Sequence, residues 1–413
     1  MTSALGTDIP RRHPDEPRAV PMITLFSKLL LLGPPTDEQW LQIGSALNTG
    51  DRPMDELVDW MYASGMASTR PLFDQALSLG IDSVPDAPEP LRKFFVLVEK
   101  PPAWVNWDQI RSGQRVFQRG GVDTIHLARD VPFLGGFAAS GINRTLLMTK
   151  TGQNGASGNA QRFAETMQWA LDCIADDGMR PGNPGYRSTL HVRLIHALVR
   201  RHVAAAPEWR AEEWGMPVNQ TDMAATILGA IYVPAVLSLA FGIVITPREL
   251  ENVTQLTRYA GWLMGIEEQY LPISFRDGMR RLNHYLMSLY RADETSKAMA
   301  VPMAKDPLQW PYRRFASIRR RIAWAQHMSI TTLFIGRTQT RKLGLPGYIL
   351  PWYPALRIPA NLVRTGAMSV LPGGRKRQAR AGLRRQHAFM HFLAGETNKT
   401  SIGHSANYIV EAA

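Results

Sequence analysis

The amino-acid sequence predicts an all-α protein built as a single large helical domain. Proline, glycine and acidic residues punctuate the chain at intervals typical of helices joined by short loops. Long runs of alternating, β-branched residues bounded by turns, which would indicate strands, are scarce. The chain has 413 residues, of which 45% are hydrophobic and 20% charged, and this composition is typical of a globular protein with a sizeable core.

Helix signals recur in order along the chain. Pro34–Glu38 places two acidic residues in a first turn directly before the apolar Trp40. A loop rich in proline and glycine, residues 181–185, precedes another helical run, for which Ser188 or Thr189 is the expected N-cap. We therefore expect helices from Asp37, from Asp108 through Phe117, over Gly141–Met148, over Asn159–Ile174, and up to His202.

The segment Met223–Pro247 contains 25 residues without a charge, which is long enough to span a bilayer. Gly229, Pro234 and Gly242 interrupt it, and the chain has no second comparable segment. Two buried helices that meet near Pro234 explain the composition as well. We favour the buried pair over a transmembrane helix.

The charge of the chain is polarised. Residues 307–395 contain 16 Lys and Arg and no Asp or Glu, which exceeds the net charge of +12 for the whole chain, so the rest is mildly acidic. Such polarity is typical of a protein that meets an anionic partner, either a membrane surface or nucleic acid. Two alternatives stay open: a solvated basic surface, with Arg375–Arg385 as a loose tail, or arginines that face carboxylates elsewhere in the fold.

The N-terminal region bears on the cellular location of the protein, and the cysteine content bears on its possible metal sites. Arg11 and Arg12 are followed by acidic residues and not by an apolar run, so we recognise no signal peptide and expect a cytoplasmic protein, with peripheral attachment to a membrane as a further expectation. Cys173 is the only cysteine, which excludes internal disulfides and metal sites built from several cysteines.

One predicted helix carries polar residues on a face that would otherwise be buried. Arg162, Thr166, Trp169 and Cys173 fall at i, i+4, i+7 and i+11, which is a single stripe of a helix. A buried stripe is normally apolar, so an arginine and a threonine on it suggest a polar pocket. The alternative is an ordinary helix whose Arg162 side chain extends to solvent.

A second helix places one histidine between two arginines. Arg193, His196 and Arg200 fall at i, i+3 and i+7 and share a face, whereas His191 and His202 lie well round from it. Several ligands from this helix therefore cannot hold one metal ion, and the remaining metal interpretation is a single axial histidine on a porphyrin. A lone helical histidine with a structural role is the alternative.

These runs, together with others, resemble the family of latex clearing proteins and MpaB-type oxygenases. The resemblance covers about residues 95–275, in order and at family-like spacing. Its motifs are Pro102-x-Trp104 through Gly113, Thr151-Gly152, Gln161–Thr166, His191–Arg200, Trp214–Asp222 and Arg258–Gly265.

The resemblance implies a globin-like core that holds haem b, with additional flanking helices. His196 falls at the family's proximal iron ligand, which would place Arg193 and Arg200 beside the haem propionates. Arg162 and Thr166 match the distal Arg and Thr, which can stabilise charge on dioxygen and supply a proton. The implied division is an N-terminal helical flank over 1–94, a haem-binding oxygenase core over 95–300, and a basic helical extension over 301–413 that packs on the core.

Glu165 departs from the family pattern. Latex-cleaving members can carry a lysine between the distal Arg and Thr, where an ammonium can cap the iron as its sixth ligand. A carboxylate is a poor mimic of that ligand, so natural rubber is a doubtful substrate. We expect Glu165 either to act as a base for an allylic proton or to point to solvent.

The leading hypothesis is therefore a haem-b-dependent dioxygenase, with O2 as co-substrate. It would cleave C=C bonds in an apolar, unsaturated substrate of the isoprenoid or polyprenyl class. A haem-binding sensor or carrier without turnover shares His196 but not the distal chemistry. A basic protein that binds a membrane surface, and needs no cofactor, is the third hypothesis; nucleic acid is the less favoured partner.

Overall fold

The computed structural model describes residues 9–20, 27–28, 30–149 and 155–394. Across these residues the regular structure is helical, apart from one isolated bridge between Ala139 and Arg291, so the all-α prediction is confirmed. The longer helices are α2 (Asp37–Ser45), α3 (Arg52–Ser64), α4 (Met66–Leu79), α5 (Glu89–Glu99), α6 (Trp107–Gly120), α7 (Val122–Ala128), α9 (Ser140–Leu147), α11 (Gly155–Ile174), α12 (Pro184–Ala204), α14 (Gln220–Ala240), α15 (Pro247–Leu263), α16 (Phe275–Leu289), α17 (Glu294–Lys305), α18 (Ala316–Ile335), α19 (Arg337–Lys342), α20 (Trp352–Val370) and α21 (Gly374–Ala394).

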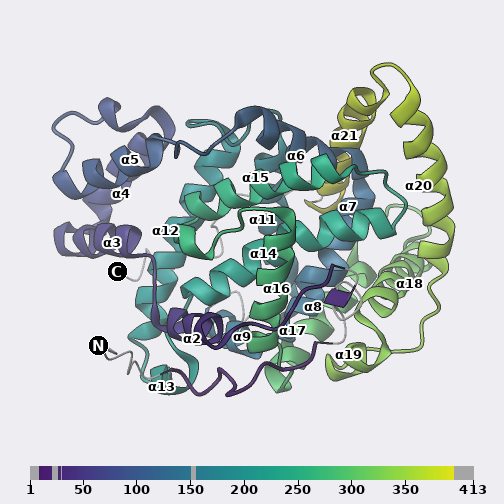
Figure 1. Ribbon diagram of the computed structural model, residues 1–413, viewed down its shortest axis with the longest axis horizontal. Coiled ribbons are helices and arrows are strands. Elements are labelled where there is room, and N and C mark those ends of the chain that lie inside the picture. Colours follow the sequence, from purple (N-terminus) through teal and green to yellow (C-terminus); the bar gives the residue numbers. More distant parts are fainter. Residues whose placement is uncertain (1–8, 21–26, 29, 150–154, 395–413) are drawn as a thin grey trace.

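The helices form a central bundle with a group at either end. Figure 1 shows α11, α14, α15 and α16 in the middle of the molecule, α3 to α5 together at one end, and α18 to α21 at the other. Short segments link them: a π-helix over Arg129–Phe133, and the short helices α8 (Leu134–Gly136) and α13 (Ala211–Trp214). The predicted boundaries at residues 94 and 300 stay a prediction.

Most helix starts follow from local sequence. Thr36 caps α2 with a capping box, since its hydroxyl accepts from the Gln39 N–H and the Gln39 side chain accepts from the Thr36 N–H. The predicted helix over Asn159–Ile174 is α11, which begins earlier, at Gly155. The expectation that Ser188 or Thr189 caps the next helix is wrong. Helix α12 begins at Pro184, a favoured first residue, so both residues lie inside the helix.

The uncharged segment forms the central helix α14, and the expectation of two helices meeting near Pro234 is wrong. Helix α14 continues through Pro234 to Ala240, and buried residues lie all round it. By length and composition it is the one helix in the described ranges that could cross a membrane, yet most of it is buried inside the fold. A helix that is apolar all round is expected at the centre of a large helical protein.

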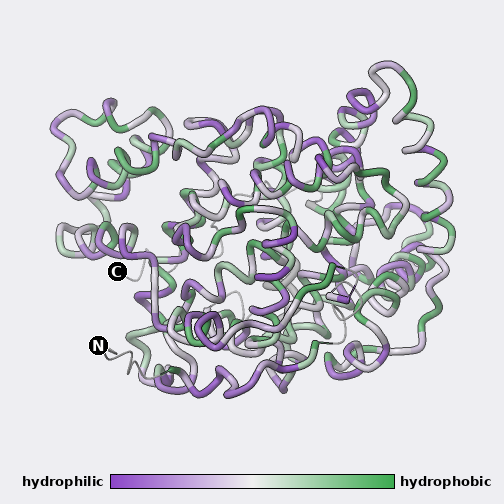
Figure 2. Tube along the Cα trace, in the orientation of Figure 1, coloured by the Kyte–Doolittle hydropathy of each residue, from purple (hydrophilic) through white to green (hydrophobic). Residues whose placement is uncertain are grey.

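The basic C-terminal region is helical and packs on the bundle, so the interpretation of Arg375–Arg385 as a loose tail is wrong. Helix α21 contains this run and contacts α6. Gln378 donates to the backbone carbonyl of Arg119, and Gln386 donates to two further carbonyls near the end of α6. Helix α20 lies at the outer edge of the molecule, where hydrophobic positions recur along its length (Figure 2).

Candidate functional site

Helices α11 and α12 form an antiparallel hairpin that brings the two predicted polar faces together. The Trp169 indole N–H donates to the Thr189 hydroxyl across the hairpin at 3.0 Å. Arg162 lies seven residues before Trp169, and His196 lies seven residues after Thr189. Seven residues are two helical turns, so both side chains lie on the faces that carry this hydrogen bond and at the same level of the hairpin.

His196 is a neutral histidine in a partly accessible position. Burial, helped by the nearby Arg200 and opposed by Asp51, lowers the pKa of its imidazole to about 4, so the ring is uncharged at neutral pH. Its Nδ1 atom is buried and has no hydrogen-bond partner among the described residues. The ring itself is half-buried, as are its neighbours Val192 and Ile195 on the same side of α12. A neutral imidazole of this kind is what an axial metal ligand requires.

Arg162 is half-buried, and its guanidinium is not extended into solvent, so the alternative of a solvent-directed side chain is wrong. Its Nη1 atom is buried and has no hydrogen-bond partner in the described part of the chain. Burial lowers the pKa of the guanidinium to about 10, and Glu165 opposes this shift. The group therefore stays protonated at neutral pH. Thr166, one turn along α11, is half-buried.

Glu165 is buried, so the expectation that it points to solvent is wrong. Its side chain accepts a hydrogen bond of 3.1 Å from Gln161, one turn earlier on α11, and its charge supports that of Arg162. In sequence, Glu165 thus lies between the two predicted distal residues, Arg162 and Thr166. Burial lowers the pKa of Arg162, and the negative charge of Glu165 opposes this shift. Its predicted role as a base stays a prediction.

Arg193 and Arg200 face carboxylates of α3 and its N-terminus. Arg193 donates to both carboxylate oxygens of Asp51, at 2.6 and 2.7 Å, and both side chains are buried. Arg200 donates to Asp55 at 2.6 Å and to the Val218 carbonyl at 3.0 Å. These bidentate and charge-assisted bonds tie α12 to α3. The predicted contact with haem propionates is not tested by this arrangement.

The other two histidines of α12 lie away from His196, as helical geometry predicts. His191 is half-buried and its Nδ1 lies 3.5 Å from Arg70 Nη2, whereas His202 is exposed. In the described ranges, no three His, Cys, Asp or Glu side chains are grouped to hold a metal ion. Cys173, on the hairpin face beside Thr189, is buried, and burial raises the pKa of its thiol.

Two of the family-like motifs, Trp214–Asp222 and Arg258–Gly265, lie beside the ion pair of Asp51 and Arg193. Gly265, at the end of the motif Arg258–Gly265, lies close to this pair. A Cβ at Gly265 would be 2.2 Å from the Asp51 carboxylate. The φ of 92° at Gly265 also favours glycine. Gln220, in the first motif, donates to the carbonyls of Gly50 and Gly265 and so ties the two segments together. Thr151-Gly152, also part of the resemblance, lies outside the described residues.

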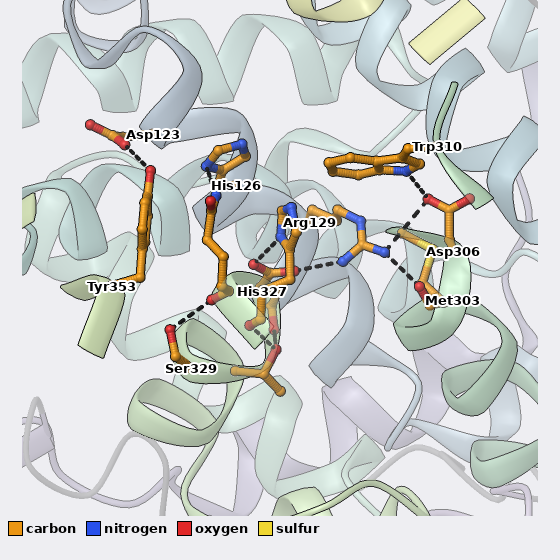
Figure 3. Close-up of polar contacts among 12 residues, drawn as sticks. Asp123, His126, Arg129, Met303, Asp306, Trp310, His327, Ser329 and Tyr353 are labelled. Carbon is orange, nitrogen blue, oxygen red and sulfur yellow. Dashed lines mark hydrogen bonds and ion pairs between the residues drawn. The ribbon is translucent and has the colours of Figure 1, made fainter. Parts of the chain in front are cut away.

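Sequence reasoning missed a second buried polar cluster, built around Arg129 and His327 (Figure 3). Arg129 and Asp130, at the start of the π-helix, are fully buried and form an ion pair of 2.8 Å. The His327 Nδ1–H donates to Asp130 at 2.6 Å, and burial lowers the pKa of His327. Arg129 also lies over the ring of Phe163 on α11. Adjacent opposite charges at Arg129 and Asp130 were the only sequence signal, because His327 is remote.

The comparisons with known proteins agree with this architecture. Residues 124–371 match the family described as ER-bound oxygenase mpaB/B'/Rubber oxygenase, catalytic domain. Among solved structures, the fold is similar to that of latex clearing protein in the closed state, with a TM-score of 0.57 and 14% sequence identity over 89% of this chain and 91% of that chain. No curated protein matches the sequence. The family match covers more than half of the chain, which therefore belongs to the mpaB and rubber oxygenase family.

Proposed function

We propose that this protein is a haem-b-dependent dioxygenase that cleaves C=C bonds in an apolar substrate of the isoprenoid class. The observation that supports the proposal is the hydrogen bond between Trp169 and Thr189, since helical spacing from it puts Arg162 and His196 at one level of the α11–α12 hairpin. Each of these two residues has a buried nitrogen with no partner among the described residues. An unpartnered buried polar atom costs about 1–3 kcal/mol. A fold that holds two of them at one level is well suited to a ligand that uses them.

The residues present fit a haem. His196 would supply the axial nitrogen, since burial already holds its imidazole neutral at physiological pH. Val192 and Ile195, half-buried beside it, would give the apolar contacts that a porphyrin needs. Bound haem would supply the activation of dioxygen. The Asp51 and Asp55 ion pairs of Arg193 and Arg200 would have to be shared or exchanged for these arginines to reach the propionates as the resemblance implies.

Arg162 and Thr166 would act on the oxygen co-substrate. The Arg162 guanidinium keeps its charge at neutral pH and lies in a desolvated position, where a positive charge stabilises developing negative charge more strongly than in water. The Thr166 hydroxyl, one turn further along α11, would donate or relay a proton. Neither role requires a residue from another part of the fold.

Glu165 would remove an allylic proton from the substrate. Its carboxylate is buried in the hairpin beside Arg162, so a proton acceptor lies within the same site as the oxygen-polarising cation. A carboxylate is a poor mimic of the lysine that can cap the iron in latex-cleaving members of the family. The proposal therefore favours a smaller polyene over polymeric rubber.

The substrate class comes from the relatives and not from a pocket in this structure. The matched family is described as a rubber oxygenase, and the similar solved structure is a latex clearing protein. Both descriptions concern those proteins. We carry the class of apolar, unsaturated chains to this protein as part of the proposal.

Oxygen consumption separates the proposed enzyme from a haem-binding sensor or carrier. Haem-loaded protein is incubated with detergent-dispersed squalene, and oxygen uptake and new carbonyl ends are measured together. We expect both in the wild type and a loss of about 100-fold in Arg162→Ala, because a preorganised cation of this kind contributes that much. Arg201→Ala, which removes an exposed arginine of α12, is the matched control and should leave the rate unchanged. Equal oxygen uptake by the wild type and Arg162→Ala would favour the carrier.

A further inference from the structure

Helix α20 buries polar residues on the side where an ordinary surface helix buries apolar ones. Asn361 and Thr365 are buried, and they bind the body of the protein through hydrogen bonds. Asn361 donates to Asp123 at 3.0 Å and to the Phe241 carbonyl at 3.1 Å. The Thr365 hydroxyl donates to the Gly242 carbonyl at 3.1 Å. Polar contacts therefore hold α20 in place, and its apolar residues are left for the opposite side.

The outward face of α20 is apolar along its whole length. Leu356, Val363 and Val370 are 64%, 74% and 82% exposed, and they recur every seven residues, which places them on one stripe. Surface helices of globular proteins normally turn such a stripe toward the core. An apolar stripe held in solvent by a polar inner face indicates a surface that meets another apolar phase.

A second exposed apolar face lies on α18, a helix that packs against α20. Phe315, Ile318 and Ile322, at the start of α18, are 77%, 58% and 51% exposed and also share one face. Helix α18 contacts α20, and the two lie together at the same end of the molecule (Figure 1). Of the 20 large hydrophobic side chains exposed in the described ranges, 12 lie between residues 315 and 371. We call the six residues Phe315, Ile318, Ile322, Leu356, Val363 and Val370 the apolar rim.

The charge around the apolar rim is of one sign. Residues 307–395, which include the rim, carry 16 Lys and Arg and no acid. Some of these cations are partnered inside the fold, as Arg357 is by Asp123 and Arg375 by Glu249. Others, including Arg319 and Arg321 next to the rim residues of α18, are exposed. An apolar surface bordered by cations is complementary to the interface of an anionic bilayer.

We propose that the apolar rim inserts into the headgroup region of an anionic phospholipid membrane while the surrounding arginines bind the lipid phosphates. A second copy of the chain is a poorer occupant, because it would bring one strongly basic surface against another. Nucleic acid would use the cations but not the exposed apolar stripe. The proposal goes beyond the proposed function, since it concerns attachment and holds whatever the protein catalyses.

Vesicle co-sedimentation of the haem-loaded full chain tests the proposal. The vesicles are phosphatidylcholine alone, or phosphatidylcholine mixed with phosphatidylglycerol. We expect binding to the mixed vesicles that weakens as salt rises. The triple variant Leu356→Ser, Val363→Ser, Val370→Ser should lower the partition coefficient by at least about tenfold, because each side chain loses apolar burial. The double variant Arg319→Gln, Arg321→Gln should lower it by about fivefold for each arginine.

The matched control removes exposed apolar residues of the same kind from α2, α4 and α5, where Leu41, Leu79 and Val96 are 53%, 74% and 57% exposed. The triple variant Leu41→Ser, Leu79→Ser, Val96→Ser should bind as the wild type does. Should the rim variant fail to fold, the gain-of-binding variant Val370→Trp is used, and it should bind more tightly. Equal losses in both triple variants, no gain in Val370→Trp, or a wild-type dimer that only the rim variant dissociates would overturn the proposal.

Discussion

Two buried polar regions contact α11, one through Phe163 and the other along the stripe of Arg162 and Trp169, and they differ in how exposed their charged groups are. In the cluster of Arg129, Asp130 and His327, the arginine and the carboxylate are fully buried and bonded to each other. In the hairpin, Arg162 and His196 are half-buried. Buried nitrogens without a hydrogen-bond partner among the described residues occur in both regions, at Arg129 and His327 as well as at Arg162 and His196, so the two regions differ in the exposure of their groups. A fully buried ion pair leaves no room for a ligand. Half-buried groups at one level of a hairpin can contact one. We therefore expect a structural role for the first region and propose a functional role for the second.

The largest effect is expected from opening the closed cluster. Asp130→Ala leaves the buried Arg129 guanidinium with only its longer, 3.6 Å ion pair to Asp306 and removes the acceptor of the His327 N–H. Breaking one partner of a buried pair costs about 3–5 kcal/mol. Urea unfolding followed by circular dichroism should show this loss in the free energy of unfolding. Asp74→Ala, which breaks an exposed pair with Arg70, is the control and should change little. Similar losses in both variants would refute the distinction between the regions.

In the open region, Glu165→Gln is expected to affect the rate and not the stability. If Glu165 removes a proton from the substrate, the amide should lower kcat by about 100-fold with little change in KM. Gln161→Ala removes only the hydrogen bond that Gln161 donates to Glu165, so its effect should be far smaller. A normal kcat in Glu165→Gln would exclude the proposed base.

The depressed pKa of His196 should make the haem-free protein less stable in mild acid. The folded pKa of about 4 lies below the ordinary value of 6.5, so between these values the unfolded state binds more protons and stability falls as pH falls. His196→Leu should remove up to about 2 kcal/mol of this dependence between pH 6.5 and 4. Unfolding curves at several pH values measure it, and an unchanged slope in the variant would show that the histidine is not held neutral by burial.

The smallest effect is expected from Arg162→Met in the haem-free protein. The variant replaces a buried cation by an apolar side chain of similar length, so the free energy of unfolding should rise by about 1 kcal/mol. Oxygen consumption by the haem-loaded variant should fall at the same time. A loss of stability would place Arg162 with Arg129, as part of a closed structural network.

The sequence alone predicts which residues share a face of α11 and of α12, because helical periodicity fixes where Arg162, Thr166 and His196 lie on their helices. It could not reach their alignment, which depends on the contact between Trp169 and Thr189. Asp51, the partner of Arg193, lies 142 residues away in the chain and has no local signal. Because their carboxylate partners are remote in sequence, the spacing of the two arginines of α12 predicts ligand binding and not ion pairs within the protein.

Helices α14 and α20 show the same limit at the level of the fold. Periodicity identifies a stripe, but it does not say whether the stripe faces the core or the solvent, and α20 turns its polar stripe inward. The continuous helix through Pro234 likewise depends on packing at the centre of the bundle, which outweighs the loss of one backbone hydrogen bond. Local rules did predict the start of α2 at Asp37 and the extent of α9 to within one residue at each end.

The central claim, that the open region of the hairpin holds haem through His196, is tested most directly by absorption spectra of the purified protein, oxidised and dithionite-reduced. We predict a Soret band that shifts on reduction, disappears in His196→Ala, and persists in His191→Ala, which removes a histidine of the same helix that lies off the hairpin face. A colourless, fully folded wild type grown with ample haem would contradict the account, and so would a Soret band that is unchanged in His196→Ala.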